Sequence, residues 1–411
     1  MRTPAEPTSN TTLAVRQIAW PSWALRVEEI KEIISRLATH LRAHDFAGHD
    51  PYDGLSSRVF NKLPLKNWKL ARLVMIHLNK RSPLNLRSIL GISEARNPKC
   101  IALCASSFLK LSRDDPNGGH YETALQLLSW LLEHQARNSH DASWGYNFDW
   151  QSRAFFAPKN SPNAVCTIFA ANAFLDAYDI SHDRAYLDVA RSSCEFLLTD
   201  LIVRQKGGLH FRYIPAQDTQ IHNVNLLAAA LLSRTAAYTG EKRLFEVGEQ
   251  AVWFSAKRLR EDGYWPYGEA ANQAWIDHYH TGFNLVALSR YEMYSEDGQF
   301  STAARKAYHF WDSHFFGPNG APRFYPDRDY PVDIHCIAQA ILTYLEYAAV
   351  DAGEKIASTL RWALGNMWSP LGYFYFQRHR LYTIRIPYAR WGQAWMLYAL
   401  SSLSNTLAEH G

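Results

Sequence analysis

Apolar residues recur every three or four positions along most of the chain, a spacing that predicts amphipathic helices. The segment 27–44 carries five Ile and Leu residues at this spacing, and 119–135 and 223–240 repeat it. Alternation typical of strands appears only in short pieces. The pattern therefore predicts a mainly helical protein.

The strand-like pieces share one feature, a glycine followed by aromatic residues. Their sequences are WGYNF (144–148), GGLHFRY (207–213), GYWPY (263–267), GAPRFYP (320–326) and GYFYF (372–376). Successive glycines lie 52 to 63 residues apart. Each is followed by a polar loop, an apolar helix and a more amphipathic helix, which predicts a repeat of helical hairpins.

Six or so such hairpins can close into a ring, with the more apolar helix of each pair inside. Five pairs are expected between residue 145 and the C-terminus, and 23–138 has room for one or two more. We predict an all-α fold, an (α/α)6-type toroid of helical hairpins with short aromatic β-hairpin loops at its mouth. It would form one domain over 21–411, after a polar, disordered leader over 1–20. An open solenoid of the same hairpins is the alternative.

Composition narrows the functional classes. The net charge of +4 is small for 411 residues and no long basic run occurs, so nucleic-acid binding is not expected. No apolar run is long enough for a membrane span, and the N-terminus lacks the apolar segment of a signal peptide. The five cysteines are scattered and include no CxxC pair, which favours a reduced, cytoplasmic protein.

Polar residues recur at equivalent places in the repeats. The positions 13 to 18 residues after each glycine include Asn163, His222, Asn225, Asp277, His278, Tyr279, His280, Asp333, His335, Tyr388 and Arg390. In a toroid these positions converge on one mouth, where helix N-termini and arginines favour anionic groups. Asp333 and Ser161 have a second interpretation as helix N-caps.

Further candidates for sugar binding lie outside this alignment. DPYDGLSS (50–57) and SPLNLRSILGI (82–92) bring Tyr52, Asp53 and Arg87. The chain has 14 Trp, 22 Tyr and 20 Phe, which either fill a large core or stack against sugar rings. The candidate platforms and their polar neighbour are Trp144, Asp149, Trp150, Trp265, Trp275 and Trp391.

Three kinds of chemistry compete at these positions. A metal site would use His278 and His280 with Asp277, His335 or Cys336, but at a helix start the two histidines point apart. Nucleophilic catalysis lacks a GxSxG motif. General acid/base chemistry on a sugar fits best, with no metal and no cofactor. Its candidate catalytic residues are Glu269, Asp277, Tyr279, His280, Asp333 and His335.

Seven stretches together resemble a bacterial family of exopolysaccharide and capsule biosynthesis proteins, the Vps type. They are DPYDGLSS, SPLNLRSILGI, NPKCIAL, WGYNFDWQSR, WIDHYHTGFNL, YPVDIHCIAQAI and IPYARWGQAWMLYAL. The resemblance runs from about residue 50 to 403. It implies a role in polysaccharide biosynthesis but no particular reaction.

A second, fold-level resemblance is to (α/α) toroid sugar enzymes such as D-glucuronyl C5-epimerases. PVDIHC (331–336) and DHYHTGF (277–283) are similar to parts of two runs in those enzymes. Pro331-Val332 and Phe283 depart from the family pattern. Because those enzymes use Tyr and Glu as acid and base, the resemblance points to Tyr279, Tyr388 and Glu269.

The sequence thus predicts an enzyme of polysaccharide biosynthesis that acts on an acidic sugar or glycan as an epimerase or lyase. Hydrolysis ranks behind these two reactions. One alternative is a non-catalytic scaffold that binds glycan or protein. Another is an isoprenoid-processing toroid, for which a deep apolar cavity would replace the polar mouth.

Overall fold

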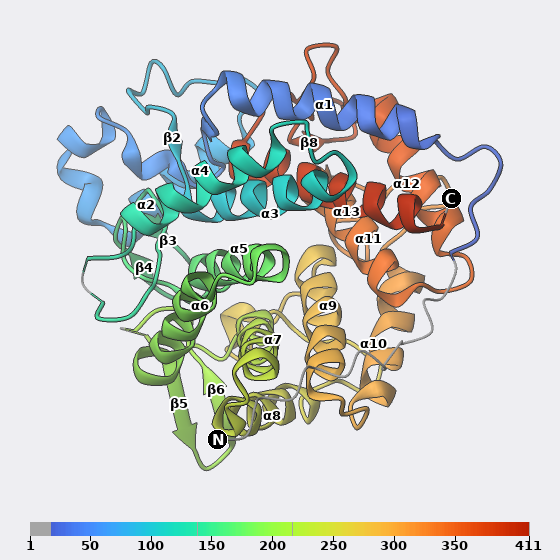
Figure 1. The fold of residues 1–411 in the computed structure, drawn as a ribbon. Helices are drawn as coiled ribbons and strands as arrows, with labels where there is room; N and C mark the ends of the chain where they lie inside the picture. Colours follow the sequence, from blue (N-terminus) through green and yellow to red (C-terminus); the bar gives the residue numbers. More distant parts are fainter. Residues whose placement is uncertain (1–17, 138, 216, 411) are drawn as a thin grey trace.

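The computed structural model describes residues 18–137, 139–215 and 217–410, and two concentric layers of helices dominate it. The inner helices are α3 (Pro98–Asp114), α5 (Ala164–Ser181), α7 (His222–Thr239), α9 (His278–Ser295), α11 (Ile334–Tyr347) and α13 (Ala394–His410). The outer helices are α1 (Val27–Ala43), α4 (His120–Glu133), α6 (Arg184–Phe196), α8 (Lys242–Ala256), α10 (Ser301–His314) and α12 (Ala352–Met367). The predicted (α/α) toroid is confirmed (Figure 1).

The ring closes because the two ends of the chain share one hairpin. Each inner helix packs against the next, and α13 packs against α3 on one side and α1 on another. Figure 1 shows α1 beside α13, although they are the first and last helices of the chain. The prediction of five complete pairs after residue 145 was therefore wrong by one helix: α13 is the fifth inner helix after that residue and the sixth of the ring, and α1 supplies its outer partner.

The inner helices begin with a shared capping pattern. Side chains of Asn97, Asn163, Asp277 and Asp333 each accept a hydrogen bond from the backbone N–H two or three residues on. Asp and Asn suit this position because their short side chains satisfy N–H groups that lack an intrahelical partner. The polar recurrence in the sequence is partly this capping, and Ser161 is not the cap of its helix.

A periodic column of side chains faces the axis of the ring. Each inner helix places its second residue on one shared cavity. In the last repeat the count starts at Ala389, where the helical turn that precedes α13 begins. The six residues are Lys99, Val165, Asn223, Tyr279, His335 and Arg390. The sixth residues form the next layer, which is Leu103, Phe169, Leu227, Phe283 and Gln339. In the last repeat the π-helical turn η6 (Ala389–Gln393) shifts this place by one residue, to Trp395.

In the first five inner helices, the thirteenth residue is charged and lies at the opposite end of the ring. These residues are Lys110, Asp176, Arg234, Arg290 and Glu346. Arg234 donates to Asp176 and Asp179 on α5, and Arg290 to Glu346 on α11. These pairs join neighbouring inner helices, and the apolar layer separates them from the polar end. The two ends of the axis are therefore chemically different.

The hairpin loops and an insert cover the polar end. The strands are β1 (Ala47–Gly48), β2 (Ala95–Arg96), β3 (Trp150–Gln151), β4 (Phe156–Ala157), β5 (Ile202–Gln205), β6 (Gly208–Phe211), β7 (Val332–Asp333), β8 (Gln377–Arg378) and β9 (Thr383–Ile384). They pair as β1–β2, β3–β4, β5–β6 and β7–β8–β9, all antiparallel. The insert between α1 and α3 contains η1 (Asp53–Ser56), η2 (Phe60–Lys62), η3 (Pro64–Asn67) and α2 (Lys69–Arg81). The π-helical η4 (Leu197–Leu201) and the short η5 (Ala271–Gln273) complete the elements.

Residues 1–17 of the expected leader lie outside the described residues. Ile18 is buried in the core, and Ala19 packs against Gly353, so the packed structure begins before residue 21. All five cysteines are buried and unpaired. Among the described residues, no helix is long and apolar enough to cross a bilayer.

The first hairpin glycine is expected to tolerate no side chain. A Cβ on Gly145 would lie 1.9 Å from the Ser161 carbonyl oxygen, so Gly145→Ala should lower the free energy of unfolding by about 1–3 kcal/mol. Gly365→Ala is the matched control, because Gly365 lies in α12 with no neighbour within 4 Å. Chemical denaturation should show this control unchanged or more stable by about 0.5–1 kcal/mol.

Candidate functional site

A cavity of about 250 Å³ opens at the polar end of the ring. Its floor is the ring of second residues described above. Its walls come from the hairpin loops and from α2 of the insert, which contributes Leu73, Ile76, His77 and Lys80 at spacings of three, one and three. The cavity is thus bounded by the inner helices below and by the insert on one side.

His280 and Asp277 form a hydrogen-bonded pair on this cavity. His280 Nδ1 lies 2.7 Å from Asp277 Oδ2, while Asp277 Oδ1 accepts the backbone N–H of His280 as the cap of α9. Trp275 Nε1 donates to the same carboxylate at 3.2 Å. Because Asp277 engages Nδ1, the imidazole orientation is fixed and Nε2 is the nitrogen left for a ligand. This is the arrangement of a general base held by a carboxylate.

His335 is a second imidazole on the cavity. It is 1% exposed, and neither ring nitrogen has a hydrogen-bond partner within the described residues. Burial, followed by the charges of Lys99 and Arg390, lowers the pKa of His335 well below its usual range, so the ring is neutral near pH 7. Buried polar atoms without partners are rare in proteins, and here they face a cavity.

Tyr279 lies against both imidazoles. Its ring centre is 4.1 Å from that of His280 and 4.7 Å from that of His335, so the two imidazole centres lie within about 9 Å of each other. Burial raises the pKa of Tyr279 well above its usual range. The tyrosine therefore keeps its proton and can act as a hydrogen-bond donor between the two histidines.

Lys99 is one of the cavity residues that the sequence analysis did not select. The amine is buried and lies 4.3 Å from the ring centre of Phe169, 4.9 Å from Trp395 and 5.3 Å from Phe283. Lys99 forms no ion pair with a carboxylate among the described residues. Burial, and after it the charge of Arg390, lowers the pKa of Lys99 to about 7.

Aromatic rings form two walls of the cavity. The ring centre of Tyr52 lies 5.4 Å from that of Trp391 and 6.2 Å from that of Trp150. Lys80 donates a hydrogen bond to the Tyr52 hydroxyl at 2.8 Å. On another wall, Trp275 stacks on Tyr267 at 4.5 Å. Flat aromatic faces beside polar groups suit sugar rings, which have apolar faces and polar edges.

Arg390 lines the cavity but is already paired. Its guanidinium donates two hydrogen bonds to Asp50, at 2.6 and 2.8 Å, and both residues are at most 5% exposed. The pair joins the insert to the first turn of the last inner helix. It holds the cavity wall in place, and its charge acts on Lys99 and His335.

Nine of the predicted site residues line this cavity. They are Tyr52, Trp150, Trp275, Asp277, Tyr279, His280, His335, Arg390 and Trp391. The other twelve lie outside its lining, each with protein partners or packing neighbours of its own.

Glu269 is the main departure from the expected acid/base set. Its carboxylate pairs with His222 Nε2 at 2.8 Å and lies near Arg258 and Arg260. The hydrogen bond from His222 lowers the pKa of Glu269. Glu269 and His222 therefore fasten the loop before α9 to α7, behind the cavity wall.

Asp333 and His278 also depart from the expectation. Asp333 caps α11 and accepts hydrogen bonds from Gln377 at 2.6 Å and Trp391 at 3.0 Å, so it positions the cavity wall. His278 packs against Trp311 of α10, and burial lowers its pKa to about 3. Its ring points away from His280, as the spacing at a helix start predicted.

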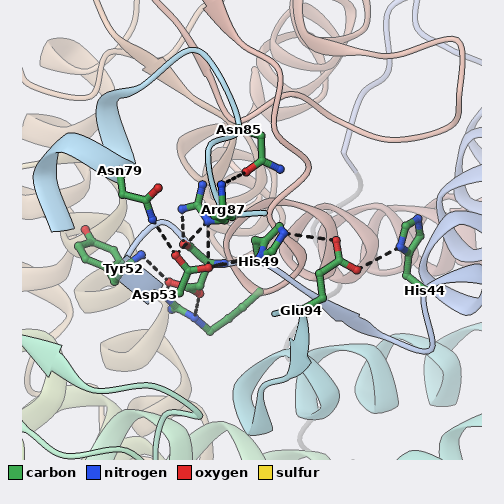
Figure 2. A network of polar contacts seen from close by, with 10 residues as sticks. His44, His49, Tyr52, Asp53, Asn79, Asn85, Arg87 and Glu94 are labelled. Carbon is green, nitrogen blue, oxygen red and sulfur yellow. Dashed lines mark hydrogen bonds and ion pairs between the residues drawn. The ribbon is translucent and has the colours of Figure 1, made fainter. Parts of the chain in front are cut away.

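Asp53 and Arg87 form a network within the insert. Arg87 Nε lies 2.9 and 3.0 Å from the two oxygens of Asp53, which also accepts from Asn79 of α2 (Figure 2). The Tyr388 ring lies 4.7 Å from the Arg87 guanidinium. The motif DPYDG is thus the internal frame of the insert, and only its Tyr52 reaches the cavity.

The remaining predicted residues have structural partners. Trp144 and Trp265 donate to carbonyls at the ends of α4 and α8, at 2.8 and 2.7 Å. Asn163 caps α5, and Asn225 bonds to Ala251 and Ser255 of α8. Asp149 accepts the backbone N–H of Lys159.

Several cavity residues were missed by the sequence analysis. They include Lys80, Lys99, Tyr146, Arg153, Tyr213, Asn223, Tyr267 and Gln273. Lys99 and Asn223 occupy the same helix position as Tyr279 and His335. Counting from each N-cap, rather than from each glycine, would have found Lys99. Asn223 already lies 15 residues after Gly208, among the aligned positions, but was not selected.

Across the described part of the chain, no three His, Cys, Asp or Glu side chains are close enough to hold an ion together. His278, His280 and Cys336, which the metal hypothesis combined, do not form such a group.

No protein-family model and no curated protein matches this sequence. Solved structures do match. A cellobiose 2-epimerase from Bacillus thermoamylovorans B4167 superposes with a TM-score of 0.65 at 9% identity, over 94% of this chain and 100% of that chain. An unsaturated glucuronyl hydrolase specific for heparin gives 0.61 at 13% identity, over 93% and 97% of the two chains. A D-mannose isomerase gives 0.60 at 10% identity, over 76% and 87%. The chain therefore has the (α/α) toroid fold of these sugar-processing enzymes.

Proposed function

We propose that the protein is a carbohydrate-active enzyme that moves protons on an anionic sugar or glycan, as an epimerase or a lyase. The observation that carries this proposal is the pair of imidazoles, His280 and His335, that face one cavity and both contact Tyr279. Two groups that exchange protons, placed around one substrate position, are what inversion at carbon requires.

The roles follow from the environments of the two imidazoles. Asp277 stabilises the imidazolium that forms when His280 Nε2 removes a proton from the carbon next to a carbonyl or carboxylate. His335 has no protein partner, and an anionic substrate beside it would favour its protonated form, with the proton taken up from solvent on binding. The imidazolium is then placed to return that proton to the carbon and becomes neutral again. Return to the opposite face gives the epimer, and loss of a leaving group from the next carbon gives the lyase product.

The charge of the cavity favours an anionic substrate. Its charged lining residues are Lys80, Lys99, Arg153, Arg390 and Asp277. Arg390 is neutralised by Asp50, whereas no carboxylate lies within 4.0 Å of the three other cations among the described residues. A uronate carboxylate beside Lys99 would regain a counter-ion there, and its negative charge would favour the ammonium form.

The similarity of fold to sugar-processing enzymes supports this proposal. The inversion at C2 that a 2-epimerase performs and the aldose–ketose conversion of a sugar isomerase both require removal of a proton next to a carbonyl. The resemblance to Vps-type proteins supports a place in polysaccharide biosynthesis, and the five unpaired cysteines support a cytoplasmic location.

Lys99→Met is expected to weaken sugar binding and to stabilise the folded protein. We expect the affinity for glucuronate to fall at least roughly tenfold, because a charge-assisted contact is lost. The free energy of unfolding at pH 7 should rise by about 1–3 kcal/mol, because a buried amine without an anionic partner is costly. Calorimetric titration and chemical denaturation measure the two effects.

The pH dependence gives the sign of the Lys99 effect. Its pKa of about 7 in the folded protein lies below the unfolded value of roughly 10.4, so the unfolded chain binds the extra proton between these values. The contribution of Lys99 to stability therefore rises with pH across this window, and Lys99→Met should remove the rise. Lys110→Met, on the same helix at the opposite end, is the control. Equal glucuronate affinity in wild type and Lys99→Met would contradict the anionic assignment.

A panel of uronic acids, their oligomers and neutral sugars in heavy water tests the proposed reaction class. Mass spectrometry should detect deuterium in an acidic member of the panel. Binding without exchange or cleavage would favour the scaffold instead, and exchange restricted to neutral sugars would remove the anionic substrate class.

A further inference from the structure

The insert between α1 and α3 carries an unusual surface. Of the 19 exposed large apolar residues among the described residues, ten lie between Val59 and Ile89. They are Val59, Leu63, Leu65, Trp68, Leu70, Val74, Leu78, Leu84, Leu86 and Ile89. Scattered exposed leucines are normal, but such a concentration marks an interaction surface.

The same segment is strongly basic. Residues 54–93 contain eight Lys or Arg and no Asp or Glu. The whole chain carries +4, so the rest of the chain carries a net −4. Five of these cations are exposed beside the apolar residues: Arg58, Lys62, Lys66, Lys69 and Arg81. We call these five and the ten apolar residues the insert surface.

Helix α2 divides the insert surface from the sugar cavity. Leu70, Val74 and Leu78 are spaced by four and are 72%, 47% and 67% exposed, so they share one solvent-facing side. Leu73, Ile76, His77 and Lys80 line the cavity instead. Trp68, 65% exposed, precedes the helix. Figure 1 shows α2 at the edge of the molecule, outside the ring of inner and outer helices.

The fold does not need these apolar side chains. The inner side of the insert has its own small core of Leu55, Phe60 and Ile76. The exposed residues add nothing to that core and leave apolar area in water. Their exposure beside five cations that pair with no carboxylate among the described residues points to an occupant that is both apolar and anionic.

We propose that the insert surface binds the surface of an anionic phospholipid membrane. Basic side chains meet lipid phosphates there, while Trp and Leu enter the boundary between headgroups and acyl chains. A second copy of the chain would bring two strongly cationic surfaces together, which is unfavourable. A nucleic acid would match the charge but leave the Leu, Val and Ile side chains in water.

Binding in this orientation has a geometric consequence. Because the exposed apolar side of α2 lies about 110° around the helix from the side that lines the cavity, at 100° per residue, the cavity would lie beside the membrane contact. Sugars presented on that surface would therefore be close to His280 and His335. This proposal does not depend on the proposed reaction.

Vesicle sedimentation of the full chain tests the proposal. The protein should bind vesicles that contain 30% phosphatidylglycerol and not vesicles of phosphatidylcholine alone. Raising NaCl from 0.1 to 0.5 M should weaken binding several-fold, because salt screens the charges. Lys62→Gln with Lys66→Gln should lower the partition coefficient by roughly 25-fold. Leu70→Ser with Leu78→Ser should lower it at least roughly tenfold.

Matched controls lie elsewhere on the surface. Lys206→Gln with Lys242→Gln removes two exposed cations, and Val350→Ser with Leu371→Ser removes two exposed apolar residues. These variants should bind vesicles like the wild type. Equal binding to both vesicle types, or no loss in the insert variants, would overturn the proposal. So would a dimer dissociated by the leucine changes, or oligonucleotide binding by a protein that ignores vesicles.

Discussion

Replacing His280 with alanine is expected to slow proton exchange on the substrate by roughly 10²–10⁴-fold, the usual contribution of a positioned general base. The reason is that Asp277 fixes this imidazole at 2.7 Å and leaves Nε2 facing the cavity. Asp277→Asn should give a comparable loss, because the amide oxygen can still cap α9 while the amide N–H donates to His280 Nδ1 and leaves the proton on Nε2, the wrong tautomer for a base. Solvent-exchange rates under saturating substrate measure both effects.

The control for this prediction is a histidine remote from the cavity. His309 is exposed on the outer helix α10, and His309→Ala should leave exchange unchanged. Circular dichroism should show His280→Ala folded, since within the described residues the imidazole hydrogen-bonds to Asp277 alone and is part-exposed. Wild-type exchange by a folded His280→Ala protein would remove His280 from the catalytic role.

Asp50→Ala should produce the largest loss of stability, about 3–5 kcal/mol. The change leaves the Arg390 guanidinium buried without its counter-ion, in a place that water reaches poorly. It also removes the ion pair that joins the insert to the last inner helix, and Asp50 accepts the backbone N–H of Tyr52 as well. Chemical denaturation, followed by circular dichroism, gives the change in the free energy of unfolding.

Two comparisons separate the buried pair from a general effect of losing a carboxylate. Asp327→Ala breaks an exposed pair with Arg328 and should cost less than about 1 kcal/mol. The double change Asp50→Leu with Arg390→Met removes both charges and should cost less than Asp50→Ala alone. A cost for Asp50→Ala no larger than that for Asp327→Ala would mean that the pair does not hold the insert in place.

The ring could be predicted from local pattern because each repeat carries its own signals. Helical periodicity, the hairpin glycines and the Asp or Asn caps are local, and they located five of the six inner helices. The closing contact of α1 with α13 joins the two ends of the chain. No periodicity specifies it, so the last hairpin was misjudged by one helix.

The site was predicted in part for the same reason. His280 and His335 follow Asp caps, and the alignment by glycine brought them together. Lys99 was missed because α3 follows the insert and has no hairpin glycine to align. Glu269 and His222 were selected as ionisable groups near the mouth. They form an ion pair with each other instead, and residue spacing does not encode the side-chain geometry that allows it.

Transfer of solvent deuterium to the substrate tests the central claim most directly. The wild type should place deuterium on the carbon next to the carboxylate of a uronic acid. Loss of either imidazole, by His280→Ala or His335→Ala, should slow the exchange by at least roughly 10²-fold while each variant still binds the sugar. Full exchange in the variant that lacks both imidazoles would contradict the account.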